Sequence, residues 1–91
     1  MKDKNIKKAA ALRYDVSRNA APTITAKGSG KIAERIVALA RDHHIPMVED
    51  GNLVQILEKL DLNTEIPTEL YQAVAEVLVF VYRMNRMNSD K

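Results

Sequence analysis

Residues 70–82 constrain the fold most, because apolar side chains recur there at the spacing of a helix with a wide hydrophobic face. One stripe contains Leu70, Val74, Val77, Leu78 and Val81. A second stripe beside it contains Tyr71, Ala75, Val79 and Tyr82. A helix with so wide an apolar face packs against other elements along most of its length. The rest of this 91-residue chain is therefore expected to fold around it as one domain.

The core of such a domain is small, because a chain of this length buries only about 60–65% of its unfolded surface. The chain has no cysteine, so neither a disulfide nor a thiolate metal site supports the fold. The run from residue 73 to 82 is broken by Glu76 and falls short of the roughly 20 apolar residues of a membrane span. No apolar stretch follows Met1, as a signal peptide would require. These features predict a soluble domain with no direct membrane insertion.

Charge is distributed unevenly along the chain. Residues 1–35 hold nine basic and three acidic side chains, whereas residues 36–82 hold two basic and eight acidic ones. Such a split favours a bipolar surface that orients a charged partner, and two solvated faces are the alternative. Nucleic acid is not the predicted partner, because the basic residues 1–35 show neither the spacing of a helix-turn-helix motif nor aromatic residues interleaved with basic ones.

The local patterns alternate between strand and helix. Residues 9–14 suit a strand or a helix, and residues 23–27 have the β-branched content of a short strand. A helix follows from Lys31 until Pro46 stops it, and residues 47–49 are a very short strand candidate. Asn52 is the expected N-cap of the next helix, and Pro67 lies in the first turn of the long helix.

We therefore predict an α/β fold with a small mixed β-sheet of three to four short strands, packed with about three helices. It includes a right-handed βαβ unit over residues 23–48 and a long C-terminal helix. The expected boundaries are a flexible basic lead at 1–8, the domain at 9–86 and a flexible tail at 87–91.

None of the short motifs predicts catalysis, a cofactor or a metal. The sequence AKGSGK at residues 26–31 resembles a phosphate loop, but Thr25 and Ile32 stand where that motif needs Gly and Ser or Thr. Its two glycines instead suit a tight strand-to-helix turn. His43 and His44 are adjacent, so they do not share a helix face as an i, i+4 metal pair does. The carboxylates have only surface spacing.

A set of segments resembles the cytoplasmic domain of the FlhB-type export-switch family of bacterial type III secretion and flagellar export. These segments are ALRYD at 11–15, AP at 21–22, AKG at 26–28, IP at 45–46 with VE at 48–49, and IPTELYQAVAE at 66–76. The resemblance covers residues 9–82 and implies a cytoplasmic domain that switches the class of exported protein. In that family the domain cleaves itself at an Asn-Pro-Thr-His loop, where the Asn side chain cyclises on its own carbonyl.

Three departures from the family pattern are visible. The cleavage position reads Lys4, Asn5, Ile6 and Lys7, with the Asn misplaced and no Pro, so no self-cleavage is predicted. The membrane part and the strand before the loop are missing, which predicts a short stand-alone FlhB-like protein; a piece of a longer protein is the alternative. Finally, residues 49–55 read EDGNLVQ where the family has Glu-Asn-x-Pro-Leu-Ala-Arg, so the family's Pro and Arg are lost.

The resemblance implies a non-enzymatic accessory or substitute for the cytoplasmic domain of FlhB. It would dock on export-gate proteins or export substrates and influence substrate specificity, in the cytoplasm and peripheral to the gate at the inner membrane. Full-length FlhB is a candidate strand donor for the sheet edge left open, and an edge blunted by the lysine-rich lead at residues 2–8 is the alternative. The partner-binding residues expected from resemblance and exposure are Lys27, Gly28, Asp50, Leu53 and Gln55. A regulatory interaction domain unrelated to secretion is the alternative, and a nucleic-acid-binding module the third, less favoured one.

Overall fold

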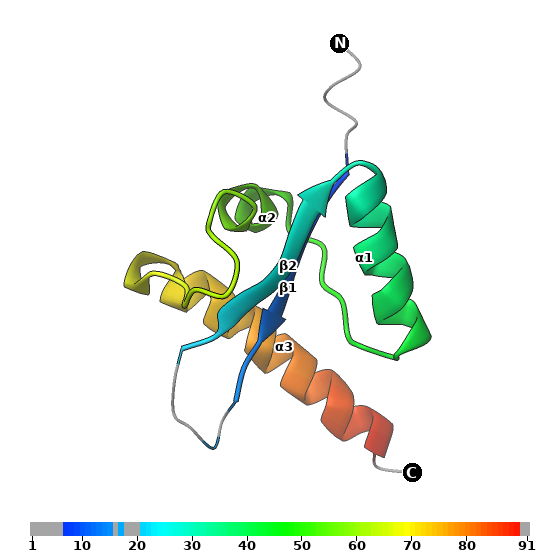
Figure 1. Ribbon diagram of the computed structural model, residues 1–91. Coiled ribbons are helices and arrows are strands. Elements are labelled where there is room, and N and C mark those ends of the chain that lie inside the picture. Colours follow the sequence, from blue (N-terminus) through cyan, green and yellow to red (C-terminus); the bar gives the residue numbers. More distant parts are fainter. Residues whose placement is uncertain (1–6, 16, 18–20, 90–91) are drawn as a thin grey trace.

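The computed structural model describes residues 7–15, 17 and 21–89, and side chains as far as residue 84 (Figure 1). The elements follow in the order β1 (Lys8–Arg13), β2 (Thr23–Ser29), α1 (Lys31–Asp42), α2 (Gly51–Leu57), the short 3-10 helix η3 (Thr68–Leu70) and α3 (Tyr71–Ser89). The two strands cross the middle of the molecule, with α1 on one side and α2 on the other (Figure 1). Helix α3 passes behind the strands and extends beyond them.

Strands β1 and β2 pair antiparallel, and one irregularity decides which side chains face the core. Ala11 pairs with Ala26 but Leu12 pairs with Ile24, so Thr25 is an extra residue on β2. In a regular strand, residues 24 and 27 would point to opposite faces, because side chains alternate. The bulge at Thr25 allows Ile24 and Lys27 to lie on the same face.

The main hydrophobic core lies between that face of the sheet, α2, and the start of α3. Five side chains are buried in it: Ile24, Leu53, Leu57, Ile66 and Val74. Ile24 and Val74 are the two large side chains that are fully buried. Val77 and Leu78 of α3 and Leu70 of η3, all members of the expected stripe, pack around them, which confirms that the long helix organises the core.

The opposite face of the sheet packs against α1 through small residues. Ala9 on β1 and Ala33 on α1 are both buried. Gly28 lies so close to α1 that a Cβ atom added there would come 2.8 Å from the Cβ of Ile32. Gly30 precedes α1 with φ 62° and ψ −129°, a backbone conformation that favours glycine. The two glycines therefore serve a tight strand-to-helix turn, as the sequence predicted.

Helix α1 ends in a Schellman motif that is closed by a histidine in place of the usual glycine. The amide of Ile45 donates to the carbonyl of Ala40 at 2.8 Å, and the amide of His44 donates to that of Arg41 at 3.1 Å. His44 has a positive φ of 58°, in the left-handed region. The helix thus ends before Pro46, and the chain then runs between α1 and the strands toward α2 (Figure 1).

The prediction of an α/β fold is confirmed, but that of a βαβ unit with three to four strands is wrong. The described residues form one two-stranded antiparallel sheet, and residues 47–49 belong to no strand. A run of three residues is too short to indicate whether a neighbouring strand would satisfy its backbone groups. Residues 45–49 instead belong to the connector between α1 and α2.

Two local predictions also need correction. Asp50, and not Asn52, caps α2, because the carboxylate of Asp50 accepts a hydrogen bond from the amide of Leu53 at 3.1 Å. The second apolar stripe of the long helix is not covered: Tyr71, Val79 and Tyr82 are 44%, 49% and 61% exposed. The helix itself continues to Ser89. In the described part of the chain, no helix is long and apolar enough to cross a bilayer.

Candidate interaction surface

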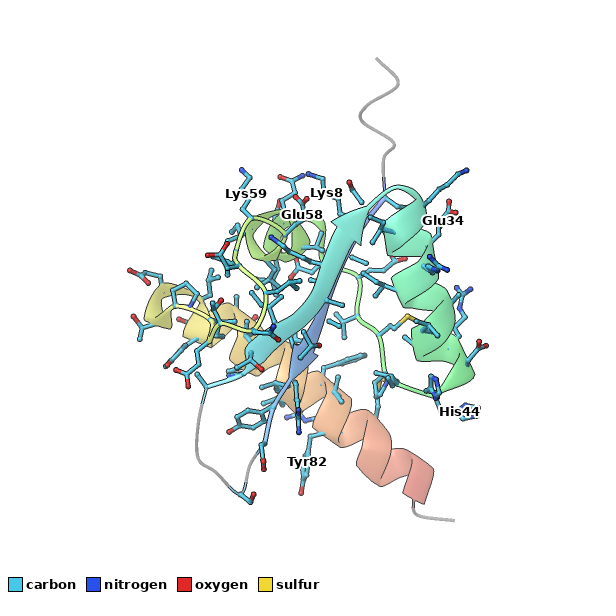
Figure 2. The ribbon with its side chains drawn as sticks, viewed as in Figure 1. Lys8, Glu34, His44, Glu58, Lys59 and Tyr82 are labelled. Atoms are coloured by element: carbon cyan, nitrogen blue, oxygen red, sulfur yellow. The ribbon has the colours of Figure 1, made fainter. Side chains whose placement is uncertain are left out.

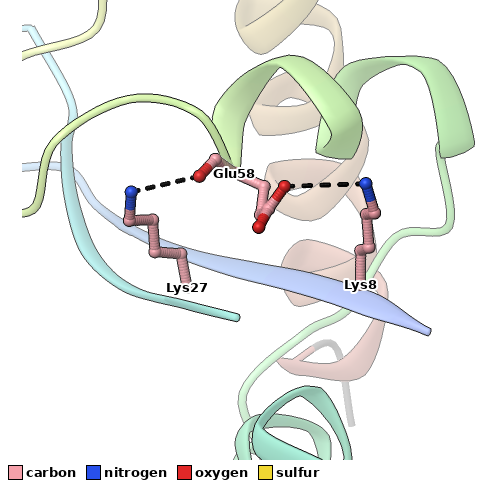
Figure 3. Close-up of polar contacts among 3 residues, drawn as sticks. All are labelled: Lys8, Lys27 and Glu58. Carbon is pink, nitrogen blue, oxygen red and sulfur yellow. Dashed lines mark hydrogen bonds and ion pairs between the residues drawn. The ribbon is translucent and has the colours of Figure 1, made fainter. Parts of the chain in front are cut away.

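The structure separates Lys27 from Gly28, although the two are neighbours in sequence. Gly28 faces α1, whereas the ammonium group of Lys27 lies on the other face and donates a hydrogen bond to the carbonyl oxygen of Glu58 at 3.1 Å (Figure 3). Lys27 is partly buried by this contact. Both residues hold helices onto the sheet in this structure, and their role toward a partner remains a prediction.

Glu58, at the C-terminal end of α2, joins two lysines from the two strands. Its carboxylate oxygen Oε1 lies 3.6 Å from Nζ of Lys8 on β1, while its backbone oxygen accepts from Lys27 on β2 (Figure 3). Lys8, Glu58 and the exposed Lys59 lie together at one end of the molecule (Figure 2). The sequence did not predict this cluster, because residues 8, 27 and 58 are brought together only by folding.

The predicted residues of the α2 segment divide between structure and surface. Asp50 uses its carboxylate as a helix cap, and Leu53 is buried in the core with 6% of its area exposed. Gln55 is exposed. The side chain of Leu53 is therefore not presented to a partner in this structure, whereas Gln55 is.

At the expected cleavage position, Lys4, Asn5 and Ile6 lie outside the described residues. Lys7 is described and exposed, and its carbonyl oxygen accepts a hydrogen bond from the amide of Gly30 at 2.8 Å. This bond joins the start of β1 to the glycine turn before α1.

The connector between α1 and α2 presents apolar side chains to solvent. Ile45, Met47 and Val48 are 55%, 43% and 39% exposed, and Ile56 on α2 is 46% exposed. Exposed apolar residues in one region are a typical feature of protein-binding surfaces. We call residues 45–48 the connector surface. The sequence had suggested a short strand at residues 47–49, so the exposure of Met47 and Val48 was not predicted.

The two edges of the sheet differ. At its start, the outer edge of β2 is covered by residues 63–66: the amide of Ile24 donates to the carbonyl of Thr64, and the carbonyl of Ile24 accepts from the amide of Asn63. Thr23 also forms a bridge with Glu65. In the described part of the chain, β1 pairs only with β2, so the outer edge of β1 is open. An open edge presents unpaired backbone donors and acceptors to another strand.

No cluster of three or more potential metal ligands occurs among the described residues. Nor do buried polar or charged residues occur there, and every described buried side-chain polar atom has a partner. The surfaces described above are thus the open edge of β1, the connector surface and the exposed side of α2.

This arrangement defines the class as a small α/β domain, with a two-stranded sheet between α1 and the pair α2 and α3. A family model described as the FlhB HrpN YscU SpaS family matches residues 6–81. The chain belongs to this family of bacterial export proteins, as the sequence resemblance predicted.

Relatives of two different lengths are similar to this chain. An uncharacterized Bacillus subtilis protein, YlqH, is 36% identical over 86 residues, which are 94% of this chain and 92% of YlqH. The flagellar biosynthetic protein FlhB of Yersinia enterocolitica is 42% identical over 83 residues, or 90% of this chain and 22% of FlhB. The FlhB of Salmonella typhimurium is 40% identical over 77 residues, which are 84% of this chain and 20% of that FlhB. The chain thus spans about a fifth of these FlhB proteins.

Solved structures show the same domain. The cytoplasmic domain of FlhB from Shewanella putrefaciens superimposes with a TM-score of 0.83 and 36% identity, covering 90% of this chain and 64% of that one. The C-terminal domain of PscU superimposes with a TM-score of 0.78 and 29% identity, covering 82% of this chain and 96% of that one. The chain is therefore similar in both fold and sequence to FlhB-type cytoplasmic domains.

Proposed function

We propose that this chain works in flagellar or type III protein export as a non-enzymatic accessory or substitute for the cytoplasmic domain of FlhB. The observation that supports this most is the superposition on the cytoplasmic domain of FlhB over 90% of the chain. A domain of the same shape can occupy the same place on the export gate, or hold the same export substrates. It acts on the cytoplasmic side of the inner membrane, peripheral to the gate.

The proposed contacts lie on the connector surface and the exposed side of α2. Met47 and Val48 supply exposed apolar area, and Gln55 supplies an exposed amide on α2. Burial of apolar area drives most protein association, and polar groups at its border give specificity. Asp50 and Leu53 stabilise the start of α2 behind this surface: the carboxylate of Asp50 caps the helix, and Leu53 packs into the core.

Complementation tests the proposal directly. The chain is expressed in a flagellated strain whose FlhB lacks its cytoplasmic domain, and secreted hook protein and flagellin are quantified. We expect export to be restored, and the ratio of hook protein to flagellin to show which class of substrate is favoured. A double variant, Met47→Ser with Val48→Ser, should restore less export than the parent chain. Leu62→Ser is the matched control, since Leu62 is 47% exposed in a different loop.

No restoration by a folded and abundant protein would reject the substitute role. The chain would then be assigned to regulatory protein interactions outside secretion, the alternative that the sequence left open. Equal rescue by the connector double variant and by Leu62→Ser would reject the proposed contact surface while leaving the export role in place.

The open edge of β1 favours strand addition as one mode of docking. An extended peptide that pairs with β1 would satisfy its free backbone groups and extend the sheet. We infer that full-length FlhB supplies this strand from the segment that precedes its matched region. Lys8 and Arg13 stand at the two ends of β1. If β1 strands of two copies paired antiparallel, Lys8 of each would lie opposite Arg13 of the other, and the like charges would oppose self-pairing of this edge.

Hydrogen exchange measures this pairing residue by residue. A peptide copying that FlhB segment should slow exchange of amides in β1, and a scrambled peptide of the same composition should not. Unchanged exchange at Lys8–Arg13 with saturating peptide would show that the edge is not the docking site.

A further inference from the structure

Helix α3 presents a second apolar feature on the side away from the core. Val79 and Phe80 are adjacent, and they are 49% and 51% exposed. Both belong to α3, which extends beyond the strands (Figure 1). The core stripe of the same helix, with Val74 only 1% exposed, lies on the opposite side. The fold therefore leaves these two large apolar side chains half-exposed.

Opposite charges stand on either side of this apolar pair. Glu76 precedes Val79 by three residues, and Arg83 follows Val79 by four, so the set has the spacing i, i+3, i+4, i+7 of one helix face. Both charged residues are exposed, and neither forms an ion pair with another described residue. We call Glu76, Val79, Phe80 and Arg83 the outer face of α3.

The outer face is complementary to itself. When two copies of α3 cross antiparallel about a two-fold axis between Val79 and Phe80, the carboxylate of Glu76 in each copy lies opposite the guanidinium of Arg83 in the other. Val79 of each copy then faces Phe80 of the other. A two-fold interface requires this reciprocity, in which residue i meets residue j and residue j meets residue i.

We propose that a second copy of this chain docks on the outer face of α3, forming an antiparallel helix pair. The charge order selects this occupant, because one patch supplies both halves of each ion pair. The contact involves one helix per copy, and is therefore smaller than the standard interface of about 1,600 Å². The dimer is consequently weak, with a Kd of about 10 μM to 1 mM.

Sedimentation velocity over a concentration series tests the proposal through two charge variants. Glu76→Arg makes both charged positions of the outer face basic, and Arg83→Glu makes both acidic. Each variant alone brings like charges together twice in a homodimer, so its Kd should rise about tenfold or more. Both substitutions lie at exposed helix positions, and circular dichroism verifies that each variant is folded.

Mixing the two variants provides the decisive result. In a heterodimer of Glu76→Arg with Arg83→Glu, every charged contact is again between opposite charges, so association should return in the mixture. Phe80→Ser should weaken self-association of the parent chain. Leu39→Ser, at a 55% exposed position on α1, should leave it unchanged.

A parent chain that stays monomeric at millimolar concentration would overturn the proposal. So would a mixture that associates no better than either variant alone, since that result would show that the outer face does not pair with itself. This inference does not depend on the export role, and neither charge variant alters the connector surface used in the complementation test.

Discussion

The ammonium group of Lys27 donates a hydrogen bond to the backbone carbonyl oxygen of Glu58 at 3.1 Å, and thereby joins β2 to the C-terminal end of α2 (Figure 3). The last carbonyl groups of a helix lack partners within the helix and carry partial negative charge. A lysine is therefore a favourable donor to them. The contact is possible because the bulge at Thr25 turns Lys27 toward the α2 side of the sheet.

Replacing Lys27 with Met should lower the free energy of unfolding by about 1–2 kcal/mol, because the charged hydrogen bond to Glu58 is lost while the aliphatic stem is retained. Urea denaturation measures the change. Lys59→Met is the matched control, since Lys59 is exposed beside Glu58, and should shift stability by less than about 0.5 kcal/mol. Equal effects of the two variants would contradict a specific role for Lys27.

Asp50→Ala should destabilise the protein by about 1 kcal/mol, because the cap on the amide of Leu53 is removed. Gln55→Ala, on the exposed side of the same helix, should change stability by less than about 0.5 kcal/mol. Thermal and urea unfolding of both variants distinguish a capping residue from a surface one. If Asp50→Ala unfolds like the parent chain, the cap contributes little.

His44→Gly should stabilise the protein by about 0.5–1 kcal/mol. Residue 44 has a φ of 58°, and glycine adopts the left-handed region without the strain of a Cβ atom. His43→Gly is the paired control: its φ is −101°, where glycine has no such advantage, and the added backbone freedom should destabilise. A loss of stability in His44→Gly would indicate that the imidazole makes a contact that outweighs backbone strain.

Gly28→Ala should destabilise the protein by about 1–3 kcal/mol, since the new Cβ atom would overlap Ile32 and push α1 off the sheet. At Gly51, in the first turn of α2, nothing lies within 4 Å of an added Cβ and φ is not positive. Gly51→Ala should therefore raise stability by about 0.4–1 kcal/mol through the unfolded state. The two variants should thus shift the melting temperature in opposite directions.

The purified chain should not cleave itself. Asn5 is followed by Ile6 and not by Pro, so the arrangement at which the family's Asn cyclises is missing from this sequence. Intact mass spectrometry after prolonged incubation should show a single full-length species. Accumulation of a fragment that begins at Ile6 would contradict this prediction.

Much of the fold was predictable from local patterns. The helical spacing of Leu70, Val74 and Leu78 placed them in the core, and the β-branched residues after Pro22 marked β2. The two glycines at 28 and 30 marked the turn before α1. These predictions succeeded because helix and strand periodicity follow from backbone geometry within one element.

The candidate site was less predictable. Leu53, which the sequence suggested for partner binding, is buried in the core, and that role remains a prediction. Met47 and Val48 were expected in a short strand but are exposed in the connector. Whether a short segment becomes a strand depends on a neighbouring strand that offers its backbone groups. In the described residues no such neighbour exists for residues 47–49.

By itself, the sequence indicated where the helices and β2 lie, that one long helix would organise the core, and which family the chain resembles. Only the tertiary structure decided which flank of that helix stays exposed, that Asp50 caps α2, and that Lys8 and Lys27 meet Glu58. Local periodicity is set by neighbouring residues, whereas burial and ion pairing depend on contacts between segments far apart in the chain. The bulge at Thr25 illustrates this: one extra residue on β2 determines the face on which Lys27 meets α2.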